Sequence, residues 1–535
     1  MTIDQINQIE ERRQAIQADL DSRKSARERN RLGQFATPIA LATEIARYVE
    51  SLTEDSSRRI CFADPSIGLG SFFSAALSVF GVERIERALG VELDPAFADA
   101  AQCLWGGAGL EIMRGDFTRI VADGSRIRSP NVVLANPPYV RHHHMDREDK
   151  ERLRSVTLQM TGVDVNGLAG LYVYFLLLTT AWMEQDGIAA WLIPSEFMDV
   201  NYGAALRGFL ADRVNLIRVH RFAPDDVQFG DALVSSVVLV FRKALPVIEH
   251  AVEFSFGGTL ADPQSREFVA CERLRASRKW SEFSGRANSN RHTVNTGKGP
   301  TLGDFFCIRR GIATGCNKFF VLDRDVARSR KLPDKYLRPI LPSPRHLKNT
   351  VIDADDDGYP MVDRQLCLID CGLPEGTVEE KYPALWDYLQ TAQSLGILDG
   401  YLIGKRSPWY KQERRETAPF LCTYMGRGAD EKRPFRFIWN RSKAIGTNLY
   451  LMLYPQSGLA AMLCRHPERA EAVHGLLGEV TGHELRGEGR VYGGGLHKIE
   501  PRELARVSAK SLIDLWPELK SEIPLQRELF DLSFQ

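Results

Sequence analysis

NVVLANPPYVR, residues 131–141, is a short apolar stretch interrupted by two consecutive prolines. The opening NVVLA predicts a buried strand, because its aliphatic residues form an uninterrupted run. Proline has no backbone N–H to donate to a sheet, so the strand must stop at Pro137. The turn therefore presents the amide of Asn136, the rigid carbonyl of Pro137 and the ring of Tyr139 at the end of a core strand.

The surrounding chain alternates strands with helices from about residue 31 to residue 243. Strands separated by helices predict an α/β fold with a doubly wound, mainly parallel sheet that is covered on both faces. Ligands bind such sheets beyond the carboxyl ends of the strands, so the turns after the strands are the places to search. We expect strands at 59–63, 87–93, 131–135, 188–194, 215–222 and 234–241, and helices at 38–50, 70–80, 95–104 and 168–185.

Two other strand ends carry acidic residues. In FADPSIGLGSF (62–72), Asp64 is followed by a glycine loop around Gly68, which lets a ligand approach backbone N–H groups at a helix start. In GVELDP (90–95), Glu92 lies where a carboxylate can accept hydrogen bonds from both hydroxyls of a ribose. A plain strand–helix turn is the alternative for the first motif alone. Together the motifs predict a cofactor that contains a nucleoside, without identifying it.

RGDFTRI (114–120) follows these two motifs along the chain. Asp116 could accept a hydrogen bond from an exocyclic amine, and Phe117 could cover the face of an adenine. Taken alone, the motif is more typical of a turn followed by a core aromatic residue.

The NPPY turn suits chemistry at an amino nitrogen. The side-chain oxygen of Asn136 and the carbonyl of Pro137 are two fixed acceptors that can take both hydrogens of an NH₂ group. An aromatic amine is a weak nucleophile because its lone pair is delocalised into the ring. Acceptors preorganised around the nitrogen favour the form with a free lone pair, and Tyr139 offers a flat face on which a base can stack.

The set of motifs resembles the γ-class S-adenosylmethionine-dependent DNA adenine-N6 methyltransferases, an NPPY family of restriction–modification systems. GQFATP (33–38) resembles the leading cofactor motif, and the Asp64 loop, GVELDP, GDF and NPPY follow in the family order. The loop departs from the family pattern, since DPSI (64–67) replaces its usual start. LYVYF (171–175), VQFGDALVSSVVLVFRK (227–243) and GGGLHKIEPREL (493–504) resemble later family segments. By this resemblance the catalytic motif is Asn136, Pro137, Pro138 and Tyr139, and Phe229 stacks on the target base opposite Tyr139. The resemblance also implies that seven residues bind the cofactor: Thr37, Asp64, Gly68, Glu92, Asp116, Phe117 and Phe175.

The resemblance implies an enzyme that transfers a methyl group from S-adenosylmethionine to the N6 amine of an adenine rotated out of double-stranded DNA. It also implies a restriction–modification setting, in which a cognate endonuclease cleaves unmodified sites. Two alternatives use similar pocket chemistry: DNA cytosine-N4 methylation and protein glutamine N5-methylation. The roughly 290 residues after the fold favour DNA over a polypeptide, because glutamine methyltransferases carry their added domain before the fold.

We expect three parts: an exposed N-terminal helical arm (1–30), a methyltransferase domain (31–245) and a mixed α+β target-recognition domain (246–535). The net charge of the chain is zero, yet residues 301–350 and 401–450 each hold 11 lysines and arginines against 4 acidic residues. Such basic surfaces are compatible with nucleic acid. Candidate DNA contacts are Arg309, Arg310, Lys318, Arg345, Lys348, Lys405, Arg406 and Arg441.

The remaining sequence features argue against a membrane or a metal. The longest strongly apolar run, 171–183, is too short to span a bilayer, and the N-terminus lacks a signal region, so we expect a cytoplasmic protein. Nine cysteines include no C-x-x-C pair. The histidine run 142–144 is tempting as a metal site, but adjacent histidines on an extended chain cannot all face one ion.

Overall fold

The fold was analysed in a computed structural model of the whole chain, which describes residues 1–53, 57–120, 129–223, 235–247, 250–283, 299–427, 435–480, 485, 490–492 and 496–522. Contacts divide the chain into two compact units. The first comprises Met1–Arg291 with Tyr492–Gly494, and the second comprises His292–Val491 with Gly495–Gln535.

The first unit is built on a nine-stranded sheet with the order β3-β2-β1-β4-β5-β7-β6-β8-β9. The strands β3, β2, β1, β4 and β5 pair in parallel, as expected for a doubly wound sheet. The antiparallel β7 then separates β5 from β6. The strands are β1 (Ile60–Asp64), β2 (Ile85–Glu92), β3 (Leu110–Arg114), β4 (Val132–Ala135), β5 (Ile188–Pro194), β6 (Asn215–Arg221), β7 (Ser236–Arg242), β8 (Ala251–Gly258) and β9 (Pro263–Ala270).

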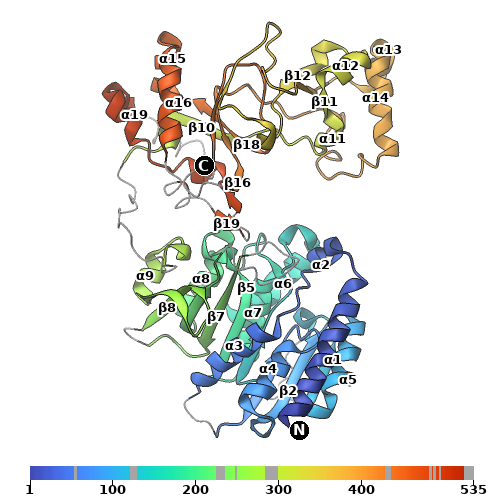
Figure 1. Cartoon of the computed structure of the whole chain (residues 1–535), viewed down its shortest axis with the longest axis vertical. Helices are drawn as coiled ribbons and strands as arrows, with labels where there is room; N and C mark the ends of the chain where they lie inside the picture. The colour runs from blue at the N-terminus through green and yellow to red at the C-terminus, as the bar shows by residue number, and fades with distance from the viewer. Residues whose placement is uncertain are drawn as a thin grey trace. The chain divides into compact units, whose positions relative to one another are not determined.

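Helices cover both faces of this sheet (Figure 1). Alternate residues of β4 enter different clusters, because successive side chains of a strand point to opposite faces. Val132 and Leu134 pack with helices from the first half of the unit, whereas Val133 and Ala135 pack with later ones. The main helices are α1 (Ile3–Ser22), α2 (Ala26–Leu32), α3 (Ile39–Ser51), α4 (Ser71–Phe80), α5 (Pro95–Trp105), α6 (Arg147–Thr161), α7 (Leu171–Trp182), α8 (Ala204–Asp212) and α9 (Cys271–Ala276).

The N-terminal segment is helical and most of its residues are exposed, as expected, but one face of it is packed against the first unit, so it is not a free arm. Helix α1 lies against α4 and α5. Ile6 and Leu20 are buried, and Arg13 forms a buried ion pair with Glu10 at 2.7 Å. A few apolar residues are thus sufficient to pack this face of α1, because the two charged side chains buried beside them neutralise each other.

The expected domain boundary at 245 falls inside the first unit. Strand β8 pairs in parallel with β6, and β9 pairs with β8, so the sheet continues to Ala270. Strand β9 alternates exposed with half-buried residues, the pattern of an edge strand. The functional division between catalysis and target recognition stays a prediction.

The second unit has small sheets and two hydrophobic clusters of its own. Its largest sheet has the order β10-β18-β15-β17-β13, and three-stranded sheets have the orders β11-β14-β12 and β16-β20-β19. The strands are β10 (Phe306–Arg310), β11 (Val321–Asp323), β12 (Leu337–Ile340), β13 (Val351–Ile352), β14 (Leu366–Ile369), β15 (Phe420–Thr423), β16 (Met425–Arg427), β17 (Phe437–Asn440), β18 (Tyr450–Pro455), β19 (Arg490–Tyr492) and β20 (Leu496–Lys498). The helices are α10 (Leu302–Phe305), α11 (Asn317–Phe320), α12 (Arg324–Ser329), α13 (Glu375–Lys381), α14 (Pro383–Ser394), α15 (Ser457–Arg465), α16 (Arg469–Glu479), α18 (Pro501–Leu504) and α19 (Lys510–Leu515).

Within the described part of the chain, none of the helices combines the length and the apolar character needed to cross a membrane.

Candidate active site

The order of strands reverses at β1 and β4, which lie side by side in the sheet. Ligands bind such sheets at this switch point. Asp64 ends β1, and Asn136 follows β4 directly. The hydroxyl of Ser66 donates to the backbone carbonyl of Asn136 at 3.0 Å and thereby joins the two loops.

The side chain of Asn136 is held in one orientation. Its Nδ2 donates to the carbonyl oxygen of Phe35 at 2.9 Å and to the hydroxyl oxygen of Thr37 at 3.1 Å. Both hydrogens of the amide are therefore used by the N-terminal segment. The oxygen Oδ1 is buried and has no hydrogen-bond partner in the protein. A buried acceptor without a donor is costly, so this atom is suited to receive one from a ligand.

The same N-terminal segment contacts Tyr139. The backbone N–H of Tyr139 donates to the carbonyl of Gly33 at 3.2 Å. Gly33 has a φ of +66°, and a Cβ there would overlap the backbone nitrogen of Tyr139, so this approach requires glycine. Tyr139 is 7% exposed. Its hydroxyl donates to the carbonyl of Leu192 at 3.0 Å, and the ring of Phe35 lies against its ring at 5.5 Å between centroids. Burial raises the pKa of this phenol well above its usual value.

Two desolvated carboxylates lie on the glycine-loop side of the site. Asp64 is 2% exposed and accepts hydrogen bonds from the backbone and hydroxyl of Ser66. Burial raises the pKa of Asp64 from 3.8 to about 8, and the nearby charge of Glu92 adds to the shift. Glu92 accepts from the backbone N–H groups of Gly68 at 3.0 Å and Asp94 at 2.8 Å. Burial raises its pKa, against the opposing effect of these hydrogen bonds.

These groups fit a cationic nucleoside cofactor. A buried carboxylate gains most from a positive ligand, because ionisation without one is disfavoured. Gly68 has a φ of +55° and open space where a Cβ would stand, so a ligand can approach its backbone. Glu92 keeps lone pairs for further hydrogen bonds, since each carboxylate oxygen accepts more than one. Leu93, next to it, is 69% exposed and offers an apolar surface at the same strand end.

The aromatic residues assigned to the cofactor lie together. Phe117 and Phe175 have ring centroids 5.0 Å apart, and Trp182 meets Phe117 edge-on at 4.6 Å. Asp116 caps its own turn, because Oδ1 accepts from the backbone and hydroxyl of Thr118 at 2.8 and 2.7 Å. Its role as an acceptor for the cofactor stays a prediction.

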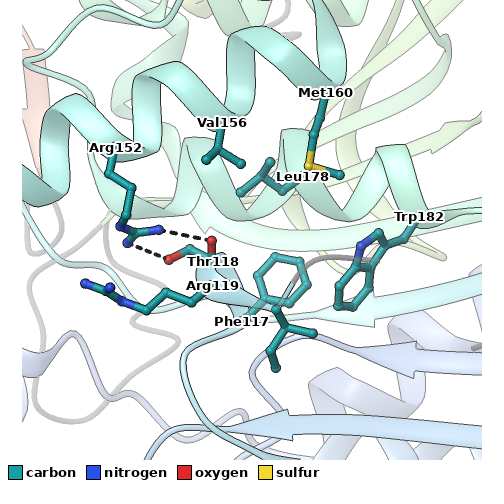
Figure 2. Close-up of a pocket in the computed structure, with 9 residues that line it drawn as sticks. Phe117, Thr118, Arg119, Arg152, Val156, Met160, Leu178 and Trp182 are labelled. Carbon is teal, nitrogen blue, oxygen red and sulfur yellow. Dashed lines mark hydrogen bonds between the residues drawn. The ribbon is translucent and has the colours of Figure 1, made fainter. Parts of the chain in front are cut away.

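A cavity of about 270 Å³ lies beside Phe117, between the turn at 117–119 and helices α6 and α7. Its walls are mainly apolar and come from Val156, Leu178 and Trp182. Figure 2 shows Arg152 reaching from α6 to Thr118, where it donates to the carbonyl at 3.1 Å and to the hydroxyl at 3.0 Å. These bonds fix the turn that carries Phe117.

The histidine run forms a short 3₁₀ turn, His142–His144, in which the ring of His142 meets that of His143 edge-on at 5.4 Å between centroids and the ring of His143 lies tilted against that of His144 at 4.2 Å. Burial lowers the pKa of His142 and His143, with contributions from neighbouring cations. Across the described ranges, no group of three or more His, Cys, Asp or Glu side chains is arranged to hold a metal ion.

Three contributions to the site were missed in the sequence. Phe35 acts through its backbone carbonyl, which no residue-type pattern reveals. Ser66 bonds to a backbone oxygen 70 residues away, and Gly33 is needed for a close approach. The signal for Gly33 was its position at the head of GQFATP. Phe229, predicted to stack on the base, lies outside the described residues.

The candidate DNA contacts of the second unit differ in their surroundings. Arg309 and Lys318 are exposed. Arg310 lies over the ring of Tyr424 at 4.1 Å. Lys348 pairs with Asp363, Arg441 pairs with Asp353, Lys405 bonds to Tyr401, and Arg345 bonds to His346, all at the surface.

Arg406 is the exception among these candidates. Its guanidinium donates to the carbonyls of Ala313 and Thr314, both at 2.7 Å, and burial lowers its pKa. These bonds tie two loops of the unit together, so its contribution is to the fold of that unit.

Comparison with known proteins gives the same outline. Residues 130–228 match the family described as Eco57I restriction-modification methylase, and residues 279–524 match the C-terminal domain of the type II methyltransferase M.Eco57I. The type II methyltransferase M.XamI of Xanthomonas campestris pv. amaranthicola is 28% identical over 91% of this chain and 86% of its own length. M.AccI of Acinetobacter calcoaceticus is 24% identical over 92% and 87%.

A solved structure shares the fold. The type IIL restriction-modification enzyme MmeI in complex with DNA aligns with a TM-score of 0.51 and 12% identity, over 82% of this chain and 64% of that chain. S-adenosylmethionine is the cofactor of this methyltransferase. The methylase match and the C-terminal match occur on one chain that also resembles two type II methyltransferases over most of its length, and the protein is a γ-class DNA methyltransferase of the restriction–modification type.

Proposed function

We propose that this enzyme methylates the exocyclic N6 amine of an adenine that is rotated out of double-stranded DNA. Asn136 and the carbonyl of Pro137 hold the amine, and Pro138 stiffens the turn. Tyr139 and Phe229 stack on the base. The second unit selects the sequence in which the adenine lies, and the modification protects that sequence from a cognate endonuclease.

The observation that carries this proposal is the buried, partnerless Oδ1 of Asn136. Because Nδ2 is already engaged by Phe35 and Thr37, the amide presents only an acceptor to the ligand. An acceptor suits a substrate that offers N–H groups, and adenine N6 offers two. The matching acceptor is the carbonyl of Pro137, which has little freedom to relax because Pro138, the next residue, restricts the ψ of Pro137.

The chain's own residues then prepare the nitrogen for attack. Two acceptors withdraw the amine hydrogens towards a tetrahedral arrangement and free the lone pair. When bound, the cofactor would supply the methyl group from its sulfonium and leave as a neutral thioether, and the methylated nitrogen would release one proton, so that no covalent enzyme intermediate is required. Stacking on two rings offsets part of the cost of unstacking the base, at ~1–3 kcal/mol per stacked base.

Asp64, Glu92, Phe117 and Phe175 are proposed to hold the cofactor. The raised pKa of Asp64 supports a cationic partner, because a positive charge would return the carboxyl to its ionised form. Glu92, at the end of β2, is proposed to accept from the ribose hydroxyls. Phe117 and Phe175 form one apolar surface suited to the adenine of the cofactor.

Sequence selection is proposed for the second unit. Its exposed cations are suited to phosphate contact, and arginine can also bind guanine edges with two hydrogen bonds. The names of the relatives M.XamI and M.AccI, both type II methyltransferases, support a role in modification.

The experiment is long-read detection of modified bases in host DNA after expression of the wild-type chain or the Asn136→Ala variant. The expected result is N6-methyladenine in a single sequence context with the wild type, and none with the variant. N4-methylcytosine in that context would assign the alternative base. Unmodified DNA, together with transfer of a methyl group to a glutamine side chain, would refute the proposal.

A further inference from the structure

We infer that Thr37 is a positioning residue for methyl transfer, which acts through Asn136 and not only on the cofactor. The inference rests on the proposed role of Asn136 in holding the target amine. Thr37 and the carbonyl of Phe35 together determine which end of the Asn136 amide faces the substrate. The N-terminal segment would thus set the polarity of the catalytic amide.

The geometry leaves the Asn136 amide one favourable orientation. Nδ2 lies 2.9 Å from the Phe35 carbonyl oxygen and 3.1 Å from Thr37 Oγ1. Rotation of the amide by half a turn would bring Oδ1 against the Phe35 carbonyl, which is an acceptor and cannot donate. Nδ2 would then point towards the amine, where two donors would oppose each other.

Thr37 is placed to exert this control. Its side chain is 6% exposed, and it lies two residues after Phe35, so one short segment supplies both acceptors. If Oγ1 were absent, one N–H of the amide would lose its partner, and the orientation would depend on Phe35 alone. The loss of a buried partner costs enough to change a rate about tenfold.

This role is compatible with a cofactor contact. A hydroxyl accepts through its lone pairs while donating its own hydrogen. Thr37 can therefore accept from Asn136 and donate to the cofactor at the same time. The two roles differ in what they change: a cofactor contact alters affinity, whereas the control of Asn136 alters the rate with cofactor saturating.

The test compares Thr37→Val, which keeps the shape and removes the oxygen, with Thr37→Ser, which restores it. Thr179→Val is the matched control, because Thr179 is fully buried and its Oγ1 has no partner. Single-turnover transfer of a tritiated methyl group is measured with saturating DNA and cofactor. Cofactor affinity is measured by calorimetry, and folding is checked by thermal unfolding. Thr37→Ala carries the same test if the valine variant does not fold.

The expected result is a rate at least about tenfold lower for Thr37→Val, recovery to within about threefold for Thr37→Ser, and no change for Thr179→Val. A wild-type rate in Thr37→Val with weakened cofactor binding would overturn the inference and leave a cofactor contact alone. Equal losses of rate in the valine and serine variants would also overturn the inference, because they would show a packing defect and not the loss of the hydroxyl oxygen. If the wild-type chain transfers no methyl group to DNA, the proposed function fails first, which is a distinct outcome.

Discussion

Ser66 and Asn136 connect the two loops of the active site, since the hydroxyl of Ser66 donates to the backbone carbonyl of Asn136 at 3.0 Å. Ser66 also bonds through its backbone to Asp64 at 2.9 Å. One residue therefore links the carboxylate proposed for the cofactor to the amide proposed for the substrate. Their relative placement matters, because transfer requires the methyl group and the nitrogen in line.

Replacement of Ser66 by alanine should slow methyl transfer by about fivefold, because the Asn136 carbonyl loses a hydrogen bond worth about 1 kcal/mol. Single-turnover kinetics with saturating cofactor measures the effect. Ser78→Ala is the control, since that hydroxyl bonds only to a carbonyl within its own helix. Equal rates for the two variants would show that the hydrogen bond from Ser66 does not contribute to methyl transfer.

Replacement of Asn136 by alanine should abolish methyl transfer, with a loss of at least about a thousandfold, while cofactor affinity stays within about threefold. The reason is that the free Oδ1 is available for the amine, whereas the acidic residues hold the cofactor. Tritium transfer and calorimetric titration report the two quantities separately. Unchanged turnover in this variant would contradict the assignment.

The stability of the cofactor-free chain should depend on pH through Asp64. Its folded pKa of about 8 lies above the ordinary 3.8, so the folded state holds a proton that the unfolded state releases. The free energy of unfolding therefore falls as pH rises from about 4 to about 8. Asp64→Asn cannot ionise, and its stability relative to wild type should increase over that window, as measured by urea unfolding.

Asp94→Asn is the control for this pH effect. Burial opposes ionisation of Asp94, but the hydrogen bond from Lys24 and its charge lower the pKa overall. A lowered pKa contributes stability that is lost only at acidic pH. The difference between Asp94→Asn and wild type should therefore stay constant from about pH 5 to about pH 9, and a parallel trend in both variants would refute the role of Asp64 burial.

Gly33→Ala should destabilise the chain by more than Gly162→Ala. The two glycines have nearly equal φ values, +66° and +69°, but only Gly33 has neighbours where a Cβ would stand. Alanine at Gly162 should cost about 1 kcal/mol for the backbone conformation. At Gly33 the clash with Tyr139 adds to this cost and should displace the NPPY loop, which denaturant unfolding and methyl-transfer assays would detect. Equal losses of unfolding free energy in the two variants would show that the NPPY loop moves to accept the alanine without destabilising the protein.

Arg309→Gln should weaken DNA binding. In a plot of the logarithm of the binding constant against the logarithm of the salt concentration, the slope should become less steep by about one. Its exposed position on β10 suggests that the free energy of unfolding will not change. Arg406→Gln should show the opposite result, with lower stability, because it breaks bonds to Ala313 and Thr314. Fluorescence anisotropy at several salt concentrations and urea unfolding distinguish them.

Much of the fold was predictable because the sheet is buried on both faces. Continuous apolar runs such as IAAWLIP predict β5 at Ile188–Pro194 without error, since burial leaves no polar face to obscure the signal. Strand β3 was missed, because it is a partly exposed strand at the sheet edge with the mixed sequence LEIMR. Strands β8 and β9 were both missed, which placed the boundary at 245 too early for the sheet, and of the two only β9 is an edge strand.

The sequence predicted which residues lie at the site, but it did not predict how their side chains are oriented. The places of Asp64, Glu92 and Asn136 at strand ends followed from topology. The inward direction of Arg406 could not be seen in a basic cluster, because sequence does not show which cations face carbonyls. The bond from Asn136 to Thr37 spans 99 residues and depends on tertiary packing.

The fixed orientation of the Asn136 amide has a consequence for damaged DNA. Hydrolytic deamination converts adenine to hypoxanthine and replaces the amine by a keto oxygen. That oxygen would face Oδ1 and the Pro137 carbonyl, and three acceptors with no proton between them repel each other. For an enzyme built in this way, deamination of the target base would block methylation at a site whose other bases are unchanged.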